Sequence, residues 1–86
     1  MSKTTALALA KRFAARVKEL TGETDEAYLV VRNKQKTATH GWIPGALASV
    51  SYEGLDLAEL SLREDFTTDK FYLEPYSSWL VGVYRR

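Results

Sequence analysis

The N-terminal part of the chain has the hydrophobic period of an α-helix. Apolar residues recur at steps of three and four in Thr4–Leu20, so they share one side of a helix. They are Ala6, Leu9, Ala10, Phe13, Val17 and Leu20. Thr4 or Thr5 can cap the first turn, and Gly22 stands where a left-handed residue often ends a helix. We therefore expect an amphipathic helix whose apolar side packs on the core.

The next segment changes to the period of two that is typical of strands. Ala27–Asn33 is the first predicted strand, and one of its faces is wholly apolar. That face carries Ala27, Leu29 and Val31 and is expected to face the helix. Residues 33–36 are then predicted to form a turn and residues 37–39 a short return strand. No Asn-Gly or Asp-Gly pair fixes the type of this turn.

A loop is predicted at residues 40–45, which contain two glycines and a proline. Ala46–Glu53 follows, and its period is ambiguous. The alternation of its apolar residues favours a strand, whereas Pro44 and Gly54 could bound a short helix. We favour the strand.

The acidic stretch after Gly54 is predicted to contain a further strand. Glu59–Glu64 alternates between polar and apolar residues, which predicts that Leu60 and Leu62 point inward. Residues 66–69 are predicted to form the turn that follows it.

Two more strands are predicted near the C-terminus. Lys70–Glu74 is the first, and Pro75 is expected to end it because proline has no N–H to give to a ladder. Trp79–Arg86 is the second. One face of it carries Trp79, Val81 and Val83. Gly82, on the other face, predicts a bulge or a close backbone contact.

This order of elements predicts an α+β fold, in which one N-terminal amphipathic helix packs on an antiparallel sheet of about four to six short strands. Residues 1–86 are enough for a single compact domain with one core. The chain has no cysteine, which excludes disulfides and thiolate chemistry. Its apolar runs are too short for a membrane span. A cytoplasmic protein is expected, although the basic, amphipathic start also fits an organellar transit peptide.

Charge is distributed unevenly although the net charge is only +1. Residues 1–40 hold eight Lys/Arg and four Asp/Glu, whereas residues 41–86 hold four Lys/Arg and seven Asp/Glu. Such a dipolar layout can steer a partner or pair two copies of the chain.

Catalytic and metal chemistry have little support in the residues. His40 is the only histidine, and base catalysis needs a positioned partner that the sequence does not indicate. No cofactor motif and no metal-ligand spacing is present, so neither a cofactor nor a metal is expected. The carboxylates after residue 52 are better explained as a solvated acidic rim than as a catalytic pair. We therefore expect a protein that is not an enzyme.

The aromatic residues favour protein binding. Consecutive pairs such as Phe71-Tyr72 and Trp79-Leu80 cannot place both side chains on one face of a sheet, so large apolar groups are left for a partner. The predicted function is a small protein-binding module, such as an inhibitor, an adaptor, an accessory subunit or a phage-type protein that blocks a host machine. The partner is another protein or a second copy. The candidate residues are Tyr72, Tyr76, Tyr84 and Arg85, with Glu59, Glu64 and Asp65 as an acidic rim.

Nucleic-acid binding is the alternative. The helix and the first hairpin carry basic residues that could contact phosphates, and Tyr28 could stack on a base. The candidate residues are Lys11, Arg12, Arg16, Lys18, Tyr28, Arg32, Lys34 and Lys36. A pI near 8.0 and the lack of a known nucleic-acid-binding motif weigh against it.

Overall fold

A computed structural model describes residues 5–25, 27–33, 43 and 45–86 of the chain. The predicted return strand at 37–39 and the loop residues around His40 lie outside these ranges, as do Thr4, Lys34 and Lys36. The helical elements are α1 (Ala6–Thr21), α3 (Leu57–Ser61) and the 3-10 turn η1 (Glu64–Phe66). The strands are β1 (Val30–Asn33), β2 (Ala48–Ser51), β3 (Phe71–Ser77) and β4 (Leu80–Arg85).

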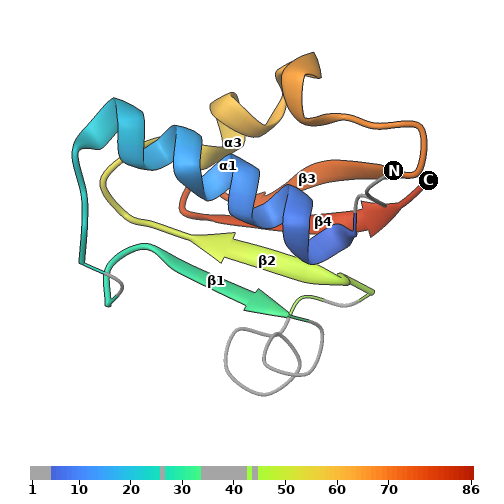
Figure 1. Cartoon of the computed structure of the whole chain (residues 1–86), viewed down its shortest axis with the longest axis horizontal. Coiled ribbons are helices and arrows are strands. Elements are labelled where there is room, and N and C mark those ends of the chain that lie inside the picture. The colour runs from blue at the N-terminus through green and yellow to red at the C-terminus, as the bar shows by residue number, and fades with distance from the viewer. Residues whose placement is uncertain (1–4, 26, 34–42, 44) are drawn as a thin grey trace.

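The four strands form one antiparallel sheet in the order β1-β2-β4-β3 (Figure 1). Helix α1 packs across β1, β2 and β4, and α3 packs beside it on β3 and β4. We call the face under these helices the inner face and the opposite one the outer face. The α+β prediction of an N-terminal helix on an antiparallel sheet is confirmed.

Helix α1 has the ends that the sequence predicts. The Thr5 hydroxyl accepts the N–H of Ala8 at 3.0 Å, which satisfies one amide of the first turn. Gly22 ends the helix at a φ of 74°, and its N–H donates to the Lys18 carbonyl. Leu20 was expected on the buried side, but it is 48% exposed. It lies in the last turn, which extends past the strands in Figure 1.

The main core lies between the helices and the inner face. Phe13 of α1 is fully buried and meets Phe66 edge-on, with ring centroids 4.9 Å apart. Val50, Val81 and Val83 approach from the sheet. A second, smaller cluster lies on the outer face and consists of Ile43, Ala46 and Leu80, with Tyr84 packed against it.

The strand predicted at Glu59–Glu64 is wrong, because this segment is helical. Asp56 caps α3 by accepting the N–H of Glu59, and the helix then buries Leu57 and Leu60. These two leucines are three residues apart, which puts them on one side of a helix. Leu62, which was expected to point inward, is 73% exposed because the helix ends just before it.

The first strand begins later than predicted, at Val30. Asp25 binds the backbone of the residues just before β1: its carboxylate accepts the N–H of Ala27, and its carbonyl accepts the N–H groups of Tyr28 and Leu29. Ala27 is consequently exposed, whereas Leu29 and Val31 pack on the core as expected.

The C-terminal hairpin corrects two further expectations. Pro75 does not end its strand, since β3 continues to Ser77 with a register shift after the proline. Proline is tolerated there because β3 is an edge strand. Trp79 does not share the buried face of Val81 and Val83, because it lies in the turn before β4 and is 45% exposed.

The strands expected at 46–53 and 79–86 are present as β2 and β4. Gly82 makes the close contact that its position predicts, although with a side chain. A Cβ atom at this residue would stand 2.8 Å from the Cε2 atom of Tyr84, so the ring lies directly over the glycine. Within the described ranges, no helix is long and apolar enough to cross a membrane.

Candidate partner-binding site

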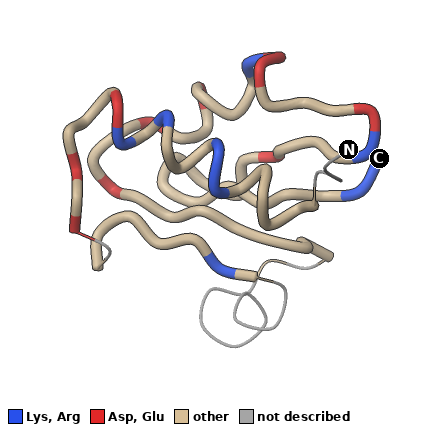
Figure 2. The backbone as a smooth tube through the Cα atoms, viewed as in Figure 1, with Lys and Arg blue, Asp and Glu red and all other residues tan. Residues whose placement is uncertain are grey.

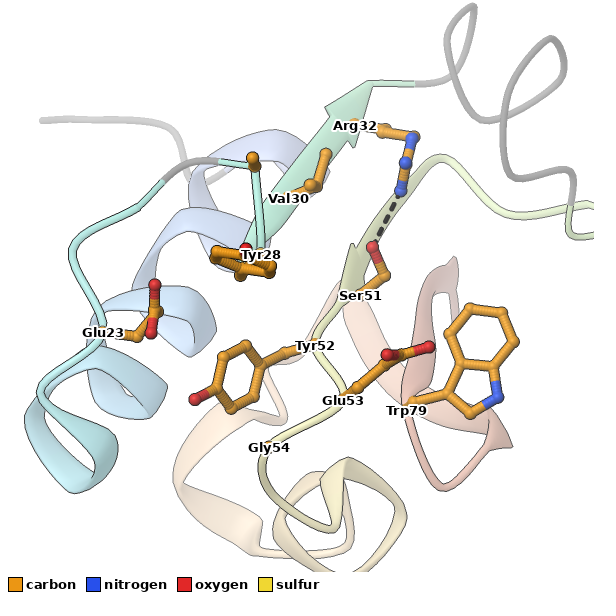
Figure 3. Close-up of a pocket in the computed structure, with 10 residues that line it drawn as sticks. Glu23, Tyr28, Val30, Arg32, Ser51, Tyr52, Glu53, Gly54 and Trp79 are labelled. Carbon is orange, nitrogen blue, oxygen red and sulfur yellow. Dashed lines mark hydrogen bonds between the residues drawn. The ribbon is translucent and has the colours of Figure 1, made fainter.

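A groove of about 620 Å³ lies at the end of the sheet where β1 begins and β2 ends (Figure 3). Three aromatic side chains line it, from three different segments: Tyr28, Tyr52 and Trp79. Tyr28 is 66% exposed and Trp79 is 45% exposed, whereas Tyr52 packs into the core. We call it the aromatic groove.

Local backbone interactions hold these three residues in place. The Asp25 carbonyl accepts the N–H of Tyr28 at 3.1 Å, which holds Tyr28 just ahead of β1. The N–H of Tyr52 donates to the Trp79 carbonyl at 2.9 Å, which ties the end of β2 to the β3–β4 turn. The three aromatic residues of the groove therefore lie just outside the strands, next to the ends of β1, β2 and β4.

The charged side chains of the aromatic groove are two carboxylates and one guanidinium. Glu23 follows the end of α1, and Glu53 lies beside Trp79 in Figure 3. The Nη1 atom of Arg32 donates to the Ser51 hydroxyl at 2.9 Å, so this cation is held against β2. No group of three or more His, Cys, Asp or Glu in the described part of the chain could hold a metal ion.

The aromatic residues that the sequence singled out lie elsewhere. Tyr72 and Tyr84 stack on the outer face, with ring centroids 5.6 Å apart and planes 23° from parallel. Burial, the charge of Glu74 and the two nearby tyrosines raise the pKa of Tyr84 above its ordinary value of 10.0. Tyr76 is exposed near the end of β3. Arg85 is exposed at the C-terminal end of β4, where Figure 2 shows a basic end of the chain.

The predicted acidic rim does not adjoin these tyrosines. Glu59 lies on α3, and Glu64 and Asp65 lie on η1, in the layer that covers the inner face. The structure therefore divides the predicted partner-binding residues between the two sides of the sheet. The carboxylates of the aromatic groove are Glu23 and Glu53. Glu53 belongs to the acidic stretch that is predicted from the sequence to be a solvated rim, whereas Glu23 was not among the candidates. The sequence signal for the exposure of Trp79 was its position next to Leu80, because two consecutive side chains of a strand cannot both face the core.

The basic candidates are also divided. Lys11 and Lys18 border a groove of about 500 Å³ between α1 and β1, which we call the lysine groove. Arg12 and Arg16 lie on the other side of α1, in a depression that also holds the acids Glu19 and Asp65. Arg16 forms an ion pair with Glu19, with Nη1 and Oε2 2.9 Å apart. Tyr28 and Arg32 lie together in the aromatic groove.

Comparisons with protein-family models, with curated proteins and with solved structures found no match to this chain.

Proposed function

We propose that this chain is a small, non-enzymatic protein-binding module that holds a Lys- or Arg-bearing segment of a partner protein in its aromatic groove. The observation that carries the proposal is the exposure of Tyr28 and Trp79 at the rim of a groove that also contains two carboxylates. Exposed aromatic surface on a small protein is costly to hydrate and commonly marks a contact with another chain.

The chemistry of the aromatic groove favours a cationic guest. The face of an aromatic ring attracts an ammonium or guanidinium group, and the attraction is worth about 0.5–2 kcal/mol, depending on how far the site is desolvated. Glu23 and Glu53 add direct Coulomb attraction, and these two carboxylates outnumber the one guanidinium in the groove, that of Arg32. A module of this kind suits an inhibitor, an adaptor or an accessory subunit.

Nucleic-acid binding has less support. A phosphate backbone binds best to a continuous basic surface. On α1 the cations face two different grooves, and Arg16 is paired with Glu19. Tyr28, the candidate for base stacking, lies beside carboxylates that would repel a phosphate.

A quantitative pull-down from a lysate of the source organism tests the proposal. The bait is the wild-type chain, Trp79→Ala, or the matched control Tyr76→Ala, which removes an exposed aromatic side chain outside the groove lining. We expect Trp79→Ala to lower the recovery of a specific protein at least about tenfold, as loss of a binding hot spot does. Tyr76→Ala and nuclease treatment should leave recovery unchanged.

Two results would overturn the proposal. One is equal recovery by wild type and a Trp79→Ala chain whose unfolding midpoint in urea is normal. The other is loss of the captured protein on nuclease treatment, which would mean that nucleic acid bridges the complex.

A further inference from the structure

The sheet has two edges, and the β3 edge is closed to further strands. Thr68 forms hydrogen bonds with the two backbone groups of Phe71 that point away from the sheet. Its hydroxyl accepts the Phe71 N–H, and its own N–H donates to the Phe71 carbonyl, both at 2.9 Å. Pro75 has no N–H to offer, and the register shift beyond it bends the strand. Such features protect a sheet edge from pairing with another chain.

At the β1 edge the Leu29 N–H donates to the Asp25 carbonyl, so the backbone groups that matter for further pairing are those of Val31. The N–H of Tyr52 donates to the Trp79 carbonyl, so the backbone groups of Tyr52 point toward β4. Backbone groups alternate in direction along a strand, so those of Val50 also point toward β4, whereas those of Ser49 and Ser51 point toward β1. Val30 and Arg32, the partners of Ser51 and Ser49, therefore direct their backbone groups to β2. The N–H and carbonyl of Val31 point away from the sheet, at an edge where no described strand pairs.

The lysine groove runs along this same edge, on the inner side. Its walls are Lys11, Ala14, Ala15 and Lys18 of α1 and residues 29–31 beside and within β1. The two alanines leave room between helix and strand, and both lysines are exposed at its border. A side chain that enters from the edge meets apolar walls and two ammonium groups.

The aromatic groove lies on the outer side of the same strand. Val30 lines both grooves, so they adjoin across β1. The outer side offers aromatic rings and the carboxylates of Glu23 and Glu53 (Figure 3). With the Arg32 guanidinium counted against the two carboxylates, the outer side keeps a net negative charge, whereas the two lysines make the inner side positive.

We propose that the partner segment adds to β1 as an extended strand in which acidic residues alternate with Lys or Arg. Successive side chains of a strand point to opposite faces. The acidic set enters the lysine groove, the basic set lies over Val30 toward the aromatic groove, and Val31 supplies the backbone hydrogen bonds. Strand addition of this kind draws affinity from the main chain and specificity from alternate side chains. The inference rests on the proposed function, because it describes the segment that the aromatic groove holds.

Fluorescence anisotropy with two synthetic peptides tests it. One peptide of about eight residues, a common strand length, alternates Glu with Arg, and its isomer groups the same residues in two blocks. We expect the alternating peptide to bind at least about tenfold more tightly, because only it satisfies both grooves at once. Hydrogen exchange of the Val31 amide should slow when it binds.

A pair of charge reversals on one helix supplies the matched control. Lys11→Glu with Lys18→Glu should weaken the alternating peptide at least about tenfold, whereas Arg12→Glu with Arg16→Glu should change binding less than about threefold. All four side chains are exposed, so folding is retained. Equal loss in both pairs would overturn the proposal, since it would reflect net charge alone. Equal affinity of the two peptides, or a Val31 amide already protected without peptide, would overturn it as well.

Trp79→Ala separates this inference from the proposed function. If this variant weakens both peptides while the Val31 amide exchanges at its free rate, the aromatic groove binds the basic residues and strand addition is wrong. If the variant weakens neither peptide, the proposed function of the groove fails.

Discussion

The two faces of the sheet differ in how they are covered. The inner face lies under α1, α3 and η1, and its side chains join one continuous core. The outer face is covered by a small cluster around Ile43 and Leu80 and by the stacked rings of Tyr72 and Tyr84. One strand illustrates the contrast: β4 directs Val81 and Val83 to the inner face and Leu80 and Tyr84 to the outer one. Stability therefore comes mainly from the inner face.

The outer face and its end also carry the exposed aromatic surface. Tyr28 and Trp79 are exposed beside the ends of strands that none of the described helices covers, and Tyr76 is exposed near the end of β3. A chain of this size has one core to fill, and that core already uses Phe13 and Phe66. Large side chains that remain outside are available to a partner. The residues that build the core are therefore distinct from the aromatic residues that stay exposed.

The largest effect on stability is expected at the centre of the inner face. Phe13→Ala removes a fully buried ring and its edge-on contact with Phe66. The lost burial and the cavity left behind should lower the free energy of unfolding by about 3–5 kcal/mol. Urea denaturation followed by circular dichroism measures the change.

Leu20→Ala is the control on the same helix, because Leu20 is apolar but largely exposed. It should change the free energy of unfolding by less than about 0.5 kcal/mol. If Phe13→Ala cost no more than Leu20→Ala, the inner face would not be the source of stability.

A smaller effect is expected on the outer face, at Gly82. An alanine Cβ there would approach the Tyr84 ring to 2.8 Å, so the ring must move away from its stack with Tyr72. Overpacking of this kind should cost about 1–3 kcal/mol, and the near-ultraviolet circular dichroism of the tyrosines should change. An unchanged spectrum with unchanged stability would mean that the outer face is loosely packed.

The sequence predicts the elements whose pattern is set by one buried side. The α1 stripe, the Thr5 and Gly22 caps and the alternation in β4 all follow from local spacing. The prediction from the sequence fails at Glu59–Glu64, where Leu60 and Leu62 alternate with polar residues in the pattern of a strand. There the helical pair Leu57 and Leu60 and the Asp56 cap decide the outcome, because α3 can bury both leucines against β3 and β4.

The candidate site was harder to predict than the fold. The sequence indicates that aromatic residues exceed what one face can bury, and so it points to an aromatic binding surface. It does not indicate which rings meet, because Tyr28, Tyr52 and Trp79 come from three distant segments. Their meeting depends on the β1-β2-β4 strand order and on the Tyr52–Trp79 hydrogen bond. Long-range pairing of this kind leaves no periodic trace in a single sequence.

The smallest predicted effect is on the pH dependence of the folding stability, to which Tyr84 of the outer face contributes. Burial first, and then the charge of Glu74, raise the pKa of Tyr84 in the folded chain above 10.0. In the pH interval between the unfolded and folded pKa values, the folded state keeps a proton that the unfolded state has lost. Stability from this group is therefore complete below pH 10.0 and is lost as the pH rises through the folded pKa.

The variant Tyr84→Phe has no hydroxyl to titrate at this position. From about pH 9 to pH 11 its free energy of unfolding, measured by urea denaturation, should therefore fall less steeply than that of the wild type. Parallel curves for the two chains would mean that the Tyr84 hydroxyl is as well hydrated in the folded state as in the unfolded one, and that the outer face around it is open to water.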